Sequence, residues 1–150
     1  MTISIDSVEP SDRADWERLY RGYADFYEIP MNDEILQTVW EWIFDPKRQF
    51  YCIVAKEDAG PALGLMHFRA MLRPSRGTEV GFLDDLFVEP AARGRGIADR
   101  MFEELSARAR NYGWPVVRWL TRDNNYRARG MYDRVATRTD WITYELNPRR

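Results

Sequence analysis

The chain has 150 residues, the size of one domain, with 45% hydrophobic and 31% charged residues, as in a globular protein. Its formal net charge of −2 argues against a protein built mainly to hold nucleic acid, which usually has a basic surface. The single cysteine, Cys52, excludes an internal disulfide and a zinc site made of cysteines. Residues 2–10 are too polar for a signal peptide and no apolar run is long enough to span a membrane, so we expect a cytoplasmic protein.

The first half of the chain alternates between strand and helix patterns. Period-2 alternation predicts a strand over 3–8, and helical spacing of large apolar residues predicts a helix over 15–25. A second helix is expected to begin at Asn32 or Asp33 and to end before Pro46. Strands follow over 51–55, 63–69 and 79–88, and Gly81 within the last of them indicates a bulge or a close backbone approach.

The second half predicts a helix over 97–111, a strand over 116–121, a helix over 125–134 and a final strand over 141–146. The order β-α-α-β-β-β-α-β-α-β predicts an α+β (mixed α/β) fold: one mixed, mostly antiparallel central sheet with helices on both faces. Residues 79–121 should form a parallel strand–helix–strand crossover. We find no repeat or linker, so residues 1–150 are expected to form a single domain.

A basic, glycine-rich loop joins the strand over 79–88 to the next helix. It includes Arg93, Gly94, Arg95 and Gly96. Glycine lets a backbone approach an anion closely, and the first turn of a helix presents unpaired N–H groups with partial positive charge. The loop therefore predicts a bound polyphosphate cofactor.

Two common phosphate motifs fit this loop poorly. The dinucleotide motif G-x-G-x-x-G would need a third glycine where the chain has Asp99, and the string G-x-x-x-x-G-K-[ST] does not occur. The plain alternative is a strand–turn–helix with chance glycines.

The loop resembles the acetyl-coenzyme A loop R/Q-x-x-G-x-G/A of the GCN5-related N-acetyltransferase (GNAT) family, with Arg93, Gly96 and Ala98 at its defined positions. Residues 125–134 resemble a second motif of that family, N-x-x-A-x-x-L/F-Y-E-K, with Asn125, Ala128 and Tyr132 in place. The resemblance spans about residues 82–146 and is nearest to the diamine and thialysine acetyltransferases. Family members then continue as L-G-F, but this chain has 135–137 as V-A-T, which indicates a different turn near the acceptor side.

The resemblance implies the family fold, in which two parallel strands splay apart around acetyl-CoA. It also implies that three segments hold this cofactor: the end of the strand over 79–88, through its backbone N–H groups, the basic loop, and the helix over 125–134. Their residues are Leu86, Phe87, Val88, Arg93, Gly94, Arg95, Gly96, Ile97, Ala98, Asn125, Ala128 and Tyr132. Asn125 is also a suitable N-cap for its helix.

Acetyl transfer to an amine requires a deprotonated amine, a stabilised thioester oxygen and a proton for the departing thiolate. The resemblance implies that Tyr132 supplies this proton, and the alternative is an ordinary core tyrosine. Asp84 aligns with a family glutamate at the amine site, so it is a candidate to attract the amine and relay its proton through water. The alternative is an aspartate paired with an arginine or capping a bulge. Because successive strand residues point to opposite faces, Asp84 and Asp85 are not expected to share one site.

Aromatic residues are concentrated in the N-terminal helices, where simple core packing is the more economical explanation. A cationic acceptor would also suit an aromatic cage, and Phe26 and Trp42 are the least periodic candidates for the acceptor pocket. His67 and Cys52, both within predicted strands, are expected to be structural.

These features together predict an acetyl-CoA-dependent N-acetyltransferase that acts directly on a primary amine of a small cationic molecule, such as a polyamine, an amino acid or an analogue. A protein lysine or N-terminus is the alternative acceptor, and a non-catalytic acetyl-CoA sensor is the alternative class. A nucleic-acid binder would need a wider basic surface. We expect no metal, nucleic-acid or membrane partner, and a homodimer is plausible from the family.

Overall fold

The structure is a computed structural model that describes residues 2–148. The chain forms two compact units, 1–120 and 121–150, of which residues 2–120 and 121–148 are described. The first unit contains the sheet with three α-helices, and the second contains one α-helix followed by an extended segment.

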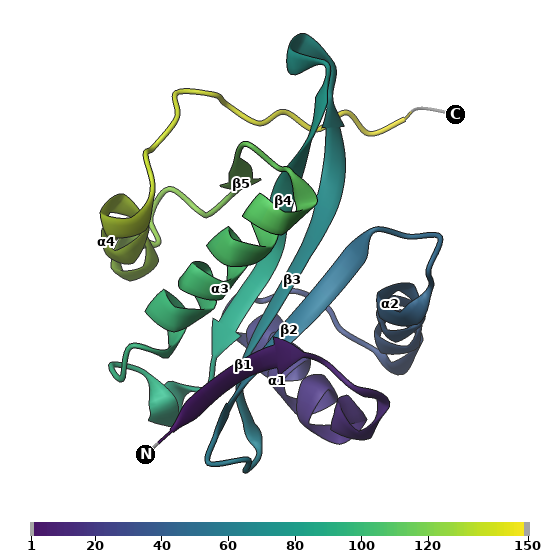
Figure 1. The fold of residues 1–150 in the computed structure, drawn as a ribbon, viewed down its shortest axis with the longest axis vertical. Coiled ribbons are helices and arrows are strands. Elements are labelled where there is room, and N and C mark those ends of the chain that lie inside the picture. Colours follow the sequence, from purple (N-terminus) through teal and green to yellow (C-terminus); the bar gives the residue numbers. More distant parts are fainter. Residues whose placement is uncertain (1, 149–150) are drawn as a thin grey trace. The chain divides into compact units, whose positions relative to one another are not determined.

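In the first unit, five strands form one sheet in the order β1-β2-β3-β4-β5 (Figure 1). Neighbouring strands are antiparallel, except for the parallel pair of β4 and β5. The predicted mixed, mostly antiparallel sheet is thus confirmed. The strands are β1 (Ile3–Ser7), β2 (Phe50–Glu57), β3 (Ala62–Arg73), β4 (Thr78–Val88) and β5 (Val117–Trp119).

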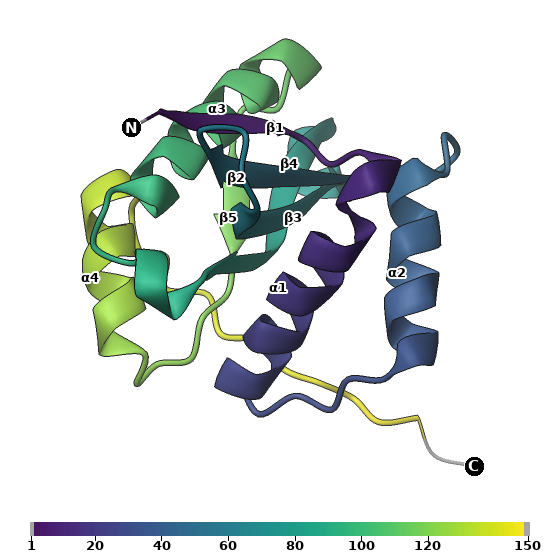
Figure 2. The same cartoon turned by 90° about the horizontal axis from the view of Figure 1, so that it is seen from below.

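Helices cover both faces of this sheet, as predicted (Figure 2). On one face lie α1 (Arg13–Phe26) and α2 (Asp33–Phe44), and on the other lies α3 (Ile97–Tyr112). The side chain of Asn32 caps α2 by accepting a 2.8 Å hydrogen bond from the Ile35 N–H, which satisfies one of the unpaired donors of the first turn.

The core on the α1 and α2 side joins both helices to the sheet. It contains Val8, Trp16, Leu19, Leu36, Val39, Cys52, Val54, Ala62, Leu65 and Phe87. Helix α1 packs very closely on β4, because a Cβ added to Gly22 would lie 2.9 Å from the Phe87 ring. On the other face, a Cβ on Gly64 would lie 3.0 Å from the Met101 sulfur, so β3 and α3 are similarly close.

Two irregularities in β4 shape the molecule. The register with β3 shifts so that His67 opposes Asp85 and Phe68 opposes Leu83, which makes Asp84 the extra residue of a β-bulge. At Gly81 the structure instead shows a close approach, since a Cβ there would lie 2.5 Å from the Trp114 ring.

The parallel pair of β4 and β5 is short. Only Gly81–Leu83 pair with Val117–Trp119, and β4 continues beyond the bulge to Val88. The two parallel strands therefore separate after Leu83, as the family resemblance implied. The half of β4 after the bulge has an edge that β5 does not cover.

The second unit contains α4 (Tyr126–Val135). The predicted strand over 141–146 is wrong, because residues 137–148 contain no strand in the structure. An apolar pattern forms a strand only where its backbone groups find a neighbouring strand to pair with. Here the apolar side chains of the segment, Trp141, Ile142, Tyr144 and Leu146, are exposed. Within residues 2–148 no helix has the length and apolar character needed to cross a membrane.

Candidate active site

The open edge of β4 presents backbone donors. The N–H of Glu89 donates to the Leu63 oxygen on β3 at 2.8 Å. Because residues of an antiparallel pair turn alternately toward and away from their partner, Phe87 turns its N–H toward β3, whereas Leu86 and Val88 turn theirs toward the open edge. Two of the three residues expected to bind acetyl-CoA through N–H groups thus have those groups on the open side.

The loop after β4 has the backbone geometry of an anion site. Gly94 and Gly96 adopt left-handed conformations, with φ of 80° and 77°, which other residues adopt only with strain. Gly96 is the N-cap of α3, and the first helical hydrogen bond runs from the Arg100 N–H to the Gly96 oxygen at 3.2 Å. The N–H groups of Ile97 and Ala98 therefore have no acceptor within the helix and point out of its positive end.

The two arginines of the loop are held in different ways. The Arg93 Nε donates to the Val88 oxygen at 2.9 Å, and its guanidinium lies 5.1 Å from the ring centre of Phe26 and 5.4 Å from that of Phe87. Arg95 forms an ion pair with Glu57 at the end of β2. The loop is thus fixed to both β4 and β2.

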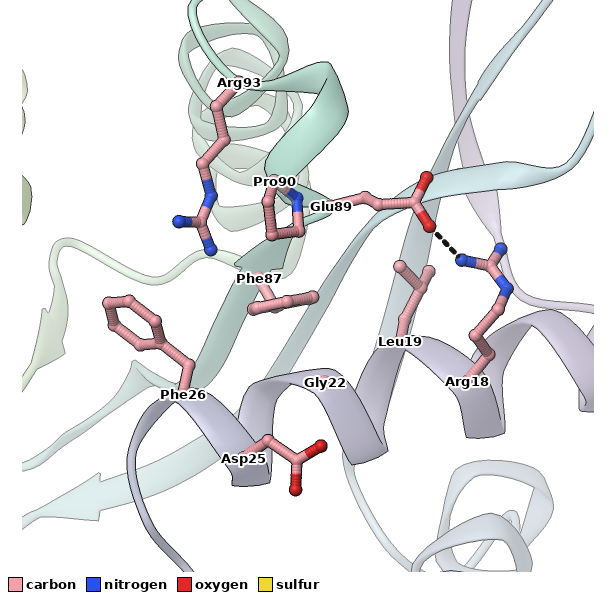
Figure 3. Close-up of a pocket in the computed structure, with 9 residues that line it drawn as sticks. All are labelled: Arg18, Leu19, Gly22, Asp25, Phe26, Phe87, Glu89, Pro90 and Arg93. Carbon is pink, nitrogen blue, oxygen red and sulfur yellow. Dashed lines mark hydrogen bonds and ion pairs between the residues drawn. The ribbon is translucent and has the colours of Figure 1, made fainter.

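A pocket of about 390 Å³ lies between α1 and the end of β4 (Figure 3). The ion pair between Arg18 and Glu89, at 2.5 Å, lies at one side of it, and Phe26 and Arg93 face one another at the other. Its lining residues are Arg18, Leu19, Gly22, Asp25, Phe26, Phe87, Glu89, Pro90 and Arg93.

The two aromatic candidates for the acceptor pocket lie in different places. Phe26 lines this pocket beside the basic loop. Trp42 lies on α2, with its ring 6.1 Å from that of Phe50 and under the Arg48 guanidinium at 5.5 Å. The structure does not bring Phe26 and Trp42 together around this pocket.

The bulge brings the side chains of Asp84 and Asp85 to the same face of the sheet. Asp84 accepts two hydrogen bonds from the Arg69 Nε, at 3.0 and 3.2 Å, while Asp85 accepts one from the His67 Nδ1 at 2.8 Å. His67 and Arg69 are two residues apart on β3 and so point to one face. The expectation that the two aspartates point to opposite faces is wrong, because a bulge places two residues opposite one and breaks the alternation.

A buried chain of hydrogen bonds supports Asp85. The Trp16 indole N–H donates to His67 Nε2 at 2.9 Å. An indole nitrogen can only donate, so Nε2 must accept and the ring proton must sit on Nδ1, facing Asp85. The Tyr20 hydroxyl donates to the same Asp85 oxygen, Oδ2, at 3.1 Å.

The surroundings push the pKa values of the two carboxyl groups apart. Burial raises the pKa of Asp84 and the negative charge of Asp85 adds to the effect, which together outweigh the opposing influence of Arg69. Burial also acts to raise the pKa of Asp85, but hydrogen bonds from His67, Tyr23 and Tyr20 outweigh it and leave the value below that of a free aspartate. Such a divided pair is typical of a site where one carboxyl group handles a proton and its neighbour stays charged.

Sequence reasoning missed Asp85 and Tyr20 as site residues. Trp16, Tyr20 and Tyr23 recur at i, i+4 and i+7 on α1, which signalled one helix face but not which strand it meets. His67 is fully buried, and Cys52 is a core residue whose thiol pKa is raised well above normal by burial, so both belong to the interior as predicted.

The candidates on α4 belong to the second unit. Asn125 is at the N-cap position, but its side chain makes no cap hydrogen bond and instead donates to the Thr121 hydroxyl at 3.3 Å. Tyr132 lies in the last two turns of α4, and its backbone oxygen accepts from the Ala136 N–H at 2.9 Å. Ala128 lies one turn before Tyr132 on the same helix.

Comparison with known proteins identifies the family. The sequence model of the Acetyltransferase (GNAT) family matches residues 16–136. The D-amino-acid N-acetyltransferase HPA3 of Saccharomyces cerevisiae is 31% identical over 146 residues, which cover 97% of this chain and 91% of that protein. The chain belongs to the acetyltransferase (GNAT) family, and it is an N-acetyltransferase that uses acetyl-CoA.

Solved structures of the family have the same fold. The structure of AAC(6')-Iy in complex with a coenzyme A bisubstrate analogue matches all of this chain and all of its own with a TM-score of 0.86 at 17% identity. The aminoglycoside 6'-N-acetyltransferase of Acinetobacter baumannii covers 99% of each chain with a TM-score of 0.82 at 18% identity. The ribosomal-protein-alanine N-acetyltransferase of Brucella melitensis biovar Abortus matches 98% of this chain and 99% of its own, with a TM-score of 0.80 at 20% identity.

Proposed function

We propose that this enzyme transfers an acetyl group from acetyl-CoA directly to a primary amine of a small cationic molecule. One observation carries the cationic part of the proposal: the bulge of β4 places two carboxylates, Asp84 and Asp85, on one face of the sheet. A pair of carboxylates attracts an ammonium group and offers a proton acceptor beside it.

The residues present suit acetyl-CoA. The left-handed glycines at 94 and 96 and the Ile97 and Ala98 N–H groups, which have no acceptor within α3, fit a pyrophosphate, and the open edge at Leu86 and Val88 offers donors to amides and to the thioester oxygen. Bound acetyl-CoA supplies the acetyl group as an activated thioester. From the second unit, the family motif assigns Asn125, Ala128 and Tyr132 to the same cofactor.

In the proposed reaction the acceptor first loses a proton, because an ammonium has no lone pair. Asp84 takes this proton, through water, since its raised pKa makes it a better base than a free aspartate. A C–N bond then forms as the C–S bond breaks, and the Tyr132 hydroxyl would protonate the departing sulfur. The nitrogen, which carries a surplus proton once the C–N bond has formed, gives that proton up and so restores the Tyr132 hydroxyl.

Relatives that are named for small molecules support this acceptor class. HPA3 is named for D-amino acids and the Acinetobacter baumannii enzyme for an aminoglycoside antibiotic, which are both small amines. We assign an amino acid, a polyamine or an analogue to this chain, with Phe26 at the pocket beside the basic loop and Trp42 as a further aromatic contact.

The remaining expectations belong to the same proposal. Residues 1–150 act as one domain, supported by a family match over residues 16–136 that spans parts of both compact units. The enzyme works in the cytoplasm without nucleic acid or membrane, supported by its net charge of −2 and its unpaired, buried Cys52. A homodimer is supported by exposed apolar side chains such as Trp141 and Ile142.

The test is a thiol-release assay with acetyl-CoA against polyamines, L- and D-amino acids, aminoglycosides and lysine peptides, next to thermal shifts with coenzyme A alone. Turnover with a small amine supports the proposal. Turnover with peptides alone assigns a protein acceptor, and a thermal shift without turnover on any of these amines contradicts the proposed acceptor class.

A further inference from the structure

Asp85 is an anion held only by neutral groups. Its hydrogen-bond donors are the His67 ring, protonated on Nδ1, and the Tyr20 hydroxyl, which both end on Oδ2, together with the Tyr23 hydroxyl. Within residues 2–148 no lysine or arginine pairs with this carboxylate, whereas Asp84 next to it is paired with Arg69.

The position of Asp85 makes this arrangement costly without a ligand. Its side chain is only 14% exposed, while that of His67 behind it is fully buried. A largely buried charge is unfavourable unless it is both hydrogen-bonded and paired with an opposite charge. The three donors satisfy the first requirement and leave the negative charge itself for a cation from outside.

The neighbouring rings suit such a cation. Tyr20 lies 4.7 Å from His67 and 5.7 Å from Tyr23, ring centre to ring centre, so the tyrosines of α1 stand next to the carboxylate. The faces of aromatic rings attract ammonium groups.

We infer that Asp85 is the binding residue for the protonated acceptor amine, and that Trp16 and His67 are positioning residues that fix its orientation. The inference rests on the proposed function and deepens it: the amine binds to Asp85 as an ammonium, and Asp84 then takes its proton. Trp16 acts at a distance, because its N–H selects the His67 tautomer that donates to Asp85.

The test compares two acceptors of similar size on the Asp85→Asn variant: a strongly basic primary amine that the wild type acetylates, and a weakly basic analogue that is uncharged at the assay pH. The asparagine keeps the size and one oxygen but removes the charge. We expect the KM of the charged amine to rise about 10- to 100-fold, the scale of one hydrogen bond to a charged group. The KM values of the uncharged amine and of acetyl-CoA should stay within about threefold of wild type, since neither ligand binds through a positive charge at Asp85.

Two further variants separate positioning from general damage. Trp16→Phe keeps an aromatic ring but removes the indole donor, so it should raise the KM of the charged amine selectively, by less than Asp85→Asn does. Asp12→Asn is a matched control, because Asp12 is a buried and ion-paired aspartate outside the site, and it should leave both amine KM values unchanged.

Equal KM increases for the charged and uncharged amines in Asp85→Asn, or no increase for either, would overturn the inference. If the wild type acetylates no amine, the proposed function fails first. Calorimetry with spermidine and coenzyme A then decides the inference separately: binding to wild type that weakens in Asp85→Asn supports it, and equal binding to both proteins or to neither overturns it.

Discussion

Two consecutive aspartates show how strongly single residues depend on their surroundings. Asp84 and Asp85 have the same side chain, yet the pKa of one is raised, chiefly by burial, and that of the other is lowered by hydrogen bonds that outweigh burial. The difference comes from their neighbours, because Asp84 meets one arginine whereas Asp85 meets a histidine and two tyrosine hydroxyls. We therefore assign proton transfer to Asp84 and charge to Asp85.

The role of Asp84 as base has a pH signature. A base must be ionised, so kcat/KM for the amine should fall as the pH drops through the Asp84 pKa, which lies above that of a free aspartate. The groups that face Asp84 are Arg69 and His67 from β3, Asp85 beside it and Tyr20 from α1. Asp84→Asn should lower kcat/KM for the amine about 100-fold and remove this acidic limb, with the KM of acetyl-CoA unchanged.

The measurement is a set of kcat/KM profiles between about pH 4 and pH 8, for the wild type and Asp84→Asn. Buffers of matched ionic strength serve as the control, because Arg69 and Asp84 are partly exposed and salt screens their interaction. An Asp84→Asn profile that keeps the wild-type acidic limb would assign that limb to another group.

The proposed role of Tyr132 as a general acid depends on its hydroxyl group. Tyr132→Phe removes only the hydroxyl, so kcat should fall about 10- to 100-fold, at the lower end of the range for general acids because a thiolate is a good leaving group. Coenzyme A affinity, measured by calorimetry, should stay the same. An unchanged rate in single-turnover experiments would exclude the role.

At the scale of elements, α3 is bounded by glycines of the same conformation. Gly96 at its N-cap and Gly113 at its C-cap both have φ of 77°, and a Cβ at either position would meet nothing within 4 Å. Replacing either with alanine adds the same strain and no clash, but only Gly96 belongs to the proposed pyrophosphate loop.

We expect Gly96→Ala and Gly113→Ala each to lower the free energy of unfolding by about 1 kcal/mol, the cost of a left-handed non-glycine residue. Only Gly96→Ala should also weaken coenzyme A binding, by about tenfold, because it disturbs the N–H groups at the positive end of α3. Urea unfolding and calorimetry measure the two effects. Equal loss of coenzyme A affinity in both variants would remove the loop from the site.

At the scale of the whole molecule, a buried ion pair joins the segment after β1 to the sheet. Asp12 accepts a 2.6 Å hydrogen bond from the Lys56 ammonium, with side-chain exposures of 6% and 29%. Burial acts to raise the pKa of Asp12, but the hydrogen bond from Lys56 and others outweigh it and lower the value. Hydrogen bonding to Asp12 raises the pKa of Lys56.

These shifts fix the pH window in which the pair stabilises the fold. A lowered aspartate pKa contributes stability above the unfolded value of about 3.9 and loses it as the pH falls through the folded value. A raised lysine pKa contributes stability below about 10.4 and loses it as the pH rises through the folded value. The pair therefore stabilises the protein between these limits.

Asp12→Asn should lower the free energy of unfolding by about 1–2 kcal/mol near neutral pH, as for one hydrogen bond between charged groups. The difference from wild type should shrink as the pH falls below about 3.9 and through the lowered folded-state pKa of Asp12, since below that value Asp12 is protonated in both states. Urea unfolding at several pH values checks this. A difference that does not depend on pH would mean that the Asp12→Asn substitution disturbs packing instead of charge.

The sequence by itself determined most of the elements and the cofactor loop. Helical and period-2 spacing placed the helices and the first five strands, and the glycines at 94 and 96 predicted the left-handed turns of the loop that we propose for the pyrophosphate, because these signals are local. The position of Asn32 at the start of α2 was predictable for the same reason.

The tertiary structure alone decided the rest. A bulge depends on the register of two strands, so the sequence could not show that Asp84 and Asp85 share a face. The bond from Trp16 to His67 joins residues 51 positions apart, and the separation of β4 from β5 depends on where their pairing stops. The apolar segment over 141–146 has a local pattern typical of a strand, yet it forms no strand in the structure. A strand requires a neighbouring strand to pair with, and the local pattern cannot show whether one is present.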